Sequence, residues 1–260
     1  MKPLIIICTL FLSISTAVTA QETYQVRQRS TDSKGLVYDK ENIYFLRPHT
    51  NGFAFGYTIG KIRSYYKTKY MSFEGGWVKH PKEVRQHSEF SGLSPSAQAA
   101  SSFVFGKQNA LLTLRMSWGN KIYVSDKAAY KGVAVGYSYE GGPLLGLLKP
   151  YYLDYQSNDT PVRPIKYTKE TRDIFLDNSS SNIVGHSNFF QGFNEIKPLL
   201  GLQGKASIHL DFAASDEYVR AFEFGAMLDI YPKKVPIMVD VENRPFFINV
   251  FANFMFGKRK

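Results

Sequence analysis

The most informative features of this 260-residue sequence are those it has little of. It contains one cysteine, Cys8, so stability must come from burial and hydrogen bonding rather than from disulfides. Beyond residue 20 no stretch reaches the roughly 18 apolar residues that a membrane-spanning helix needs. Hydrophobic residues make up 44% and charged residues 21%, which excludes a disordered or low-complexity chain. No repeat at a solenoid or propeller period is visible, so one folded domain is expected.

The first twenty residues have the pattern of a secretory signal. A basic start at Lys2 is followed by an apolar run over residues 4–12 and by small residues ending at Ala20. The run is too short to cross about 30 Å of hydrocarbon, which disfavours an anchor. We therefore expect residues 1–20 to be a signal peptide cleaved near Ala20, which also removes Cys8 from the mature chain.

Alternation of side chains with period two recurs along the chain and predicts β-strands. In the first example Phe53, Phe55 and Tyr57 alternate with Ala54 and Gly56. A segment around Pro150 is interrupted by that proline, and Gly141-Gly142-Pro143 before it reads as a tight turn. Residues 21–51 are interpreted as an N-terminal arm that could hold a further strand pair around residues 43–47. About eight strands are expected, with ten still open, over the ranges 53–60, 70–77, 111–118, 132–140, 144–154, 206–212, 221–230 and 246–256.

The composition of the two faces indicates how these strands assemble. One face is dense in Phe, Tyr, Leu and Val, and the other is rich in Gly, Ala and Ser with isolated charges. Small residues with a few charges suit the interior of a narrow barrel that side chains fill, and the apolar face suits lipid. The fold expected is an all-β, antiparallel up-and-down transmembrane β-barrel with a side-chain-filled lumen, over residues 52–260. The long aperiodic stretch 155–199 is a candidate functional loop.

Three segments carry a resemblance to a known family. Residues 132–152 (GVAVGYSYEGGPLLGLLKPYY), 189–212 (FFQGFNEIKPLLGLQGKASIHLDF) and 247–258 (FINVFANFMFGK) resemble the small outer-membrane β-barrel proteins of Bacteroidetes-type bacteria. The resemblance implies a barrel in the outer membrane of a Gram-negative bacterium. It implies no activity and carries no catalytic residue over to this chain.

Ser207, His209 and Asp211 form the sharpest catalytic candidate, because residues two apart on one strand share a face. Membrane-embedded lipid hydrolases use a similar pair of His and Ser, although in the opposite order and facing lipid. The alternative is structural, since the apolar neighbours of His209 predict that it points into the barrel. Buried charges must be paired, so we expect an interior polar network of Arg115, Glu140, His209, Asp211, Glu223 and Asp229.

The formal net charge of +10 is concentrated in a few segments. Residues 61–85 hold seven basic and two acidic residues, and we expect the patch Lys61, Arg63, Lys67 and Lys69 to meet the phosphates of outer-membrane lipids, including lipopolysaccharide. Nucleic acid is not expected as a partner, because no binding motif is present. The histidines at positions 49, 80, 87 and 186 lack ligand spacing, so neither a metal nor a cofactor is expected.

These observations favour a monomeric outer-membrane protein with a structural, anchoring or surface-interaction role, inserted by the barrel-assembly machinery. Three alternatives remain open at this point. They are an outer-membrane lipid hydrolase or acyltransferase using Ser207 and His209, a narrow diffusion channel, and a soluble periplasmic β-sandwich that binds a ligand. The sequence specifies neither a ligand nor which loops face outward.

Overall fold

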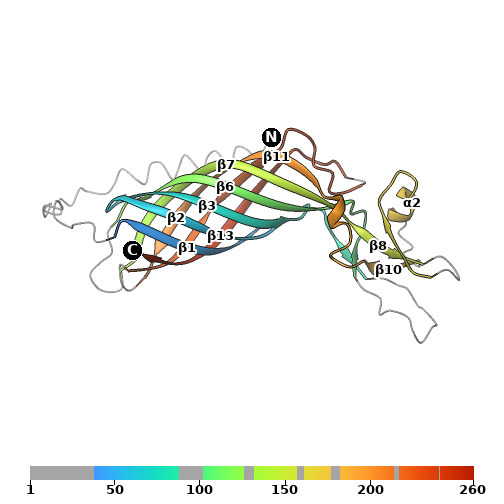
Figure 1. Cartoon of the computed structure of the whole chain (residues 1–260), viewed down its shortest axis with the longest axis horizontal. Coiled ribbons are helices and arrows are strands. Elements are labelled where there is room, and N and C mark those ends of the chain that lie inside the picture. The colour runs from blue at the N-terminus through green and yellow to red at the C-terminus, as the bar shows by residue number, and fades with distance from the viewer. Residues whose placement is uncertain are drawn as a thin grey trace, which may run out of the picture. The chain divides into compact units, whose positions relative to one another are not determined.

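In the computed structural model the chain forms a closed barrel of eight antiparallel strands (Figure 1). Each strand pairs with its neighbour in sequence, and the last pairs with the first, which makes the barrel up-and-down. The described residues are 38–87, 102–125, 132–156, 161–176, 182–213, 217–239 and 241–260. The expected signal peptide lies outside them. The barrel strands are β1 (Lys40–His49), β2 (Gly52–Ser64), β3 (Lys67–Val78), β6 (Asn109–Tyr123), β7 (Ala134–Pro150), β11 (Lys197–Asp211), β12 (Tyr218–Ile230) and β13 (Phe246–Arg259).

The expected fold is confirmed, with eight strands rather than ten, and the soluble sandwich is wrong because the sheet closes on itself. The wall is apolar outside and polar inside. On β6, Leu114 and Trp118 are exposed on the outer face, while Thr113, Arg115 and Ser117 are buried on the inner face. The same alternation runs through the other strands, as the two-residue period of a β-strand requires.

The first strand of the barrel corrects the expected domain boundary. Residues 40–49, assigned to the N-terminal arm, are β1 and close the barrel between β2 and β13. Its inward face combines Glu41 and Arg47 with Ile43 and Phe45. Charged and bulky apolar residues therefore share one face of this strand. The pattern that marks the other strands, a face of small residues alternating with an apolar face, is missing here. The barrel therefore begins at Lys40 rather than at residue 52.

A second correction concerns Gly141-Gly142-Pro143, which lies inside β7 and forms no turn. A Cβ on Gly142 would lie 2.1 Å from the carbonyl oxygen of Met116, so only glycine fits there. Between β6 and β7, Arg115 pairs with Leu144 and the next pair is Trp118 with Gly141, so the ladder is interrupted between them. Pro143, which has no N–H to donate, falls within this interruption of the ladder. The expected strands 132–140 and 144–154 are therefore one long strand up to Pro150, followed by the short strand β8 (Tyr152–Tyr155).

The two ends of the barrel differ in their connections. At the short-turn end Tyr65 and Tyr66 join β2 to β3, and β13 ends there. The strands β3, β7 and β12 end at the other, long-connection end, where long connections lead to the next barrel strand and only the turn from β1 to β2 is short. The expected loop 155–199 contains regular structure, with β9 (Arg163–Lys166), α2 (Arg172–Phe175), β10 (Ile183–His186) and η2 (Phe193–Glu195). Strands β10, β8 and β9 form a small sheet, and β4 (Arg85–Gln86) pairs with β5 (Phe103–Val104).

The connection between β12 and β13 closes the long-connection end from within. Val235, Ile237 and Met238 are buried and pack against inward residues of the barrel, including Leu111 and Phe247. Backbone N–H groups of residues 108 and 109 donate to the carbonyl of Ile237 at 2.8 and 3.1 Å, which fixes this segment. We call residues 235–238 the apolar plug. Among the described residues no helix is long and apolar enough to cross a membrane.

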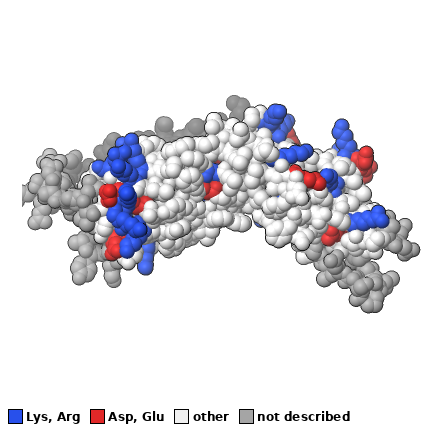
Figure 2. Space-filling view, viewed as in Figure 1, with Lys and Arg blue, Asp and Glu red and all other residues white. Residues whose placement is uncertain are grey.

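The exposed charged side chains of the described barrel strands lie toward the ends of the barrel. Figure 2 shows Lys, Arg, Asp and Glu gathered at two ends of the face in view, with an almost uncharged band between them. That band consists of exposed apolar side chains such as Phe55, Leu114, Ile208 and Phe224. An exposed apolar band of this extent is unusual for a water-soluble surface.

Candidate functional site

The barrel interior contains a group of six buried charged side chains, which we call the central ion cluster. Arg115 is bidentate to Asp229, with nitrogen to oxygen distances of 3.2 and 2.6 Å, and also binds Glu74 at 2.7 Å. Lys205 contacts Glu74 and Glu140, each at 2.7 Å. The sixth member, Arg47, pairs with Glu74 and lies 3.8 Å from Glu140. Three cations therefore balance three carboxylates.

Strand register places these partners opposite one another. Glu74 on β3 lies directly across from Arg115 on β6, and Lys205 on β11 lies across from Glu140 on β7. Directly opposed residues of an antiparallel pair have Cβ atoms about 4.5–5.5 Å apart. Since all six side chains are buried, this arrangement satisfies charges that would otherwise be costly to bury.

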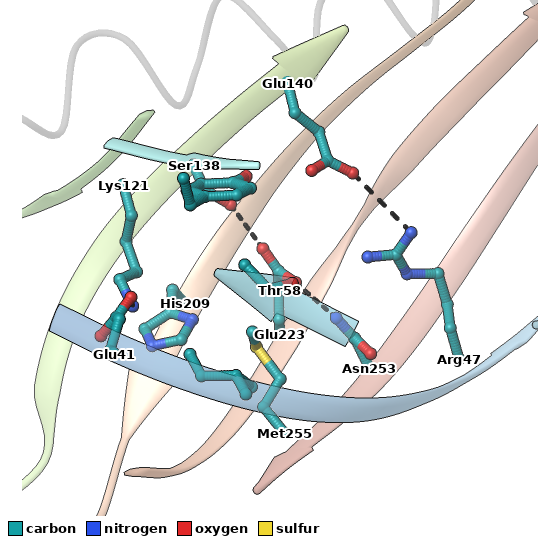
Figure 3. Close-up of a pocket in the computed structure, with 12 residues that line it drawn as sticks. Glu41, Arg47, Thr58, Lys121, Ser138, Glu140, His209, Glu223, Asn253 and Met255 are labelled. Carbon is teal, nitrogen blue, oxygen red and sulfur yellow. Dashed lines mark hydrogen bonds and ion pairs between the residues drawn. The ribbon is translucent and has the colours of Figure 1, made fainter. Parts of the chain in front are cut away.

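A second interior group surrounds Glu223 (Figure 3). Ser207 donates to this carboxylate at 2.5 Å. Asn253 donates at 2.7 Å, and Ser138 also donates to it. The hydroxyl oxygens of Ser138 and Ser207 are 2.6 Å apart. Serine and asparagine donors, rather than a direct ion pair, therefore hold this carboxylate.

A third group lies toward the short-turn end. Lys121 binds Glu41 at 2.6 Å, and Arg259 binds Asp211 at 2.9 Å. Because Arg259 also lies 3.6 Å from Glu41, two cations and two carboxylates form one continuous set. His209 is fully buried beside it, and its Nε2 is 3.4 Å from the hydroxyl of Tyr123.

The catalytic candidate of the sequence is not assembled as a triad. Ser207 bonds to Glu223 and Ser138, whereas His209 Nε2 faces Tyr123 and Asp211 pairs with Arg259. Within the described ranges no hydrogen bond joins Ser207 to His209. A nucleophile and its base must be in hydrogen-bond contact, so this geometry does not support the hydrolase.

The six residues of the expected interior network are all buried in the lumen, but they divide among the three groups. Sequence reasoning missed several of their partners. Glu74, Lys121 and Lys205 could have been found by extending the inward parity of their strands. Glu41 and Arg47 carried no such signal, since residues 43–47 were given only as a possible strand pair within the N-terminal arm, with no inward face assigned. The missed members are Glu41, Arg47, Glu74, Lys121, Lys205 and Arg259.

These groups leave little open space in the lumen. The cavity lined by Arg47, Lys121, Ser138, His209 and Glu223 has a volume of about 20 Å³, which is room for roughly one water molecule. The apolar plug covers the lumen at the long-connection end. In the part of the chain that the structure describes, no group of three His, Cys, Asp or Glu residues could hold a metal ion.

The expected basic patch lies on the outer wall at the short-turn end. Lys40, Lys61 and Lys69 stand opposite one another on three adjacent strands. These three lysines are exposed, and other exposed basic residues lie beside them around the barrel wall. We call the whole set the basic rim, formed by Lys40, Lys61, Arg63, Lys67, Lys69, Arg220 and Lys258.

Comparison with solved structures returns eight-stranded barrels of low similarity. The N-terminal β-barrel domain of OprF from Pseudomonas aeruginosa is 8% identical, with a TM-score of 0.33, and covers 86% of this chain and 98% of its own. Ail, the attachment invasion locus protein of Yersinia pestis, is 9% identical, with a TM-score of 0.35 and coverages of 85% and 93%. Neisserial surface protein A is 8% identical, with a TM-score of 0.31 and coverages of 85% and 92%. No protein-family model matches the sequence, and no curated protein matches it.

Proposed function

We propose that this chain is an outer-membrane β-barrel that anchors a structured surface at its long-connection end for interaction with molecules outside the cell. The observation that carries the proposal is the inverted wall, which is apolar outside and ion-paired inside. Strands of 10 to 17 residues reach or exceed the roughly 9–11 that a tilted strand needs to cross a bilayer. A closed barrel also leaves no sheet edge unsatisfied in lipid. The export signal expected over residues 1–20 supports the same location.

The filled lumen favours anchoring over transport. Eight-stranded barrels have interiors that side chains can fill, and here ion pairs and the apolar plug occupy the lumen. Ser207 points into the lumen, where its hydroxyl donates to Glu223, and this likewise disfavours a reaction with lipids outside the barrel wall.

Insertion into a membrane is tested on the whole chain. The membrane fraction is extracted with carbonate, and gel mobility is compared with and without boiling. We expect the protein to resist extraction and to change mobility on boiling, because a closed barrel survives detergent until it is heated. Release by carbonate together with unchanged mobility would refute the barrel in the membrane.

Orientation follows from the connections, since outer-membrane barrels have short periplasmic turns and longer extracellular loops. We propose that residues 231–245 face outward and that Ser64 faces the periplasm. Lys233→Cys and Ser64→Cys, both at exposed positions, form a matched pair for labelling intact cells with a membrane-impermeant maleimide. Only Lys233→Cys is expected to react before the cells are opened, and the reverse result would invert the orientation.

This orientation indicates which lipids the basic rim would contact. It lies on the periplasmic side, where we propose that it contacts phospholipid phosphates rather than the lipopolysaccharide anticipated from the sequence. Each basic side chain near an anionic membrane surface contributes about 1 kcal/mol.

A further inference from the structure

A cavity of about 280 Å³ lies at the long-connection end, separate from the lumen. Its floor is the outer face of the barrel, formed by Trp77, Ala110 and Lys149. These residues face outward because each adjoins an inward residue of the barrel core, namely Val78, Leu111 and Leu148. Residues 151–152 and 186–189 complete the lining together with parts of β4 and β5.

Lys149 is the exception among the buried Lys and Arg side chains of the described residues. Five of the six lie within 4 Å of a carboxylate, including Lys107, which lines the same cavity and binds Glu83 at 2.7 Å. Lys149 is only 6% exposed, and no carboxylate pairs with it in the described residues. Its ammonium lies 5.0 and 5.5 Å from the ring centroids of Phe189 and Phe193. Cation–π contacts offset only part of the cost of burying an ammonium.

Two other cations that line the cavity, Lys79 and Arg85, have no carboxylate partner among the described residues. Glu83 is the one acidic residue among the described lining residues, and it already binds Lys107. The indole N–H of Trp77 is buried, and no acceptor for it exists among the described residues. A cavity with excess positive charge and an unused N–H donor is built to receive an anion.

We propose that this cavity binds a phosphate group, with Lys149 as its principal contact. The volume is close to the lower end of the roughly 300–1,000 Å³ of small-ligand pockets and exceeds the needs of one inorganic ion. Aromatic rings beside the ammonium suit the apolar part of a phosphorylated amphiphile. That the site faces the outside of the cell rests on the proposed function, whereas the binding of phosphate does not depend on that function.

Binding is measured by calorimetry on the full chain in non-ionic detergent, with inorganic phosphate, dihexanoyl phosphatidic acid and, as a zwitterionic control, dihexanoyl phosphatidylcholine. Saturable binding of either of the first two probes is expected. Tighter binding of phosphatidic acid assigns the site to a lipid-borne phosphate, and equal binding assigns it to free phosphate. Lack of binding by both probes at millimolar concentration, or equal binding of phosphatidylcholine, overturns the proposal.

Two variants localise the binding. Lys149→Met should weaken it about tenfold, as expected for loss of a charge-assisted contact. The control Lys197→Met removes the same charge from an exposed position at the same end and should leave affinity unchanged. Asn188→Asp, which is isosteric and keeps the acceptor for Phe190 N–H at 3.0 Å, should weaken binding about threefold through repulsion.

Equal affinity in wild type, Lys149→Met and Asn188→Asp would overturn the site. The boiling-dependent change in mobility is recorded for each variant, so that a folding defect is recognised. Because the assay uses detergent-solubilised protein, failure to bind phosphate leaves the membrane location untouched. Failure of carbonate resistance would refute the membrane location without affecting the phosphate measurement.

Discussion

The pairing of Arg115 with Asp229 gives the sharpest test of the interior. Arg115 makes two hydrogen bonds to Asp229 and one to Glu74, and both carboxylates are fully buried. In Arg115→Met, Glu74 keeps Arg47 and Lys205 as partners. Asp229 loses the one cation that it contacts among the described residues, which leaves a buried carboxylate uncompensated. Breaking a buried ion pair in this way costs about 3–5 kcal/mol.

The double variant Arg115→Met with Asp229→Leu removes one cation and one carboxylate together. Replacement of a buried pair by apolar residues is often nearly neutral, and the remaining loss is the single bond from Arg115 to Glu74. We therefore expect a net cost of about 1–2 kcal/mol for the double variant. The single variant should thus be less stable than the double variant, although it carries fewer changes.

Urea unfolding in lipid vesicles, followed by tryptophan fluorescence, measures these free energies. The control is Lys166→Met at the pair of Lys166 and Glu195, which are 43% and 41% exposed. It should lower stability far less than Arg115→Met does, because water screens an exposed ion pair. If Arg115→Met is as mild as this control, the lumen is hydrated enough to screen its charges. That result would refute the sealed interior and reopen the channel hypothesis.

Three further predictions follow from the same structure. Ile237→Ala in the apolar plug should lower the free energy of urea unfolding by about 2–4 kcal/mol. The control Ile248→Ala, at a residue 64% exposed on the outer face, should lower it less in detergent. Equal losses would contradict burial of the plug. Leu114→Arg in the uncharged band should destabilise the inserted protein by about 2–4 kcal/mol, and an unchanged urea midpoint in vesicles would argue against contact with lipid. Purified wild-type protein should give no discrete conductance steps in planar bilayers, because ion pairs fill the lumen, and resolved steps would count against the filled lumen.

The fold was largely predictable because β-strand alternation is a local signal. The strands over residues 53–60 and 111–118 are predicted correctly, since a bulky apolar face alternates with a small or polar face, apart from Leu111 on the inward face. The strand β1 was not predicted as part of the barrel, because Ile43 and Phe45 share its inward face with Glu41 and Arg47. The prediction of a turn at Gly141-Gly142-Pro143 is wrong. Gly142 is required by the close approach of β6 to β7, a tertiary contact that the local sequence does not show.

The partners within the lumen were less predictable than the burial of its charges. Parity along a strand places Glu140 and Asp229 inside, but only register between strands determines what each meets. Glu140 lies opposite Lys205, and Asp229 binds Arg115 across the lumen. Neither relation can be read from one strand alone, since register depends on how all eight strands close.

The contrast between the lumen and Lys149 indicates where function resides in this molecule. Inside the barrel, the central ion cluster and the pairs beside it contain as many cations as carboxylates, so those charges satisfy one another and stabilise the wall. Lys149 lies outside that arrangement, buried beneath aromatic rings in a cavity that Lys79 and Arg85 also line. Folding alone does not explain a buried ammonium without a carboxylate, because a neutral side chain would pack there at lower cost. A ligand that supplies the missing negative charge explains its position.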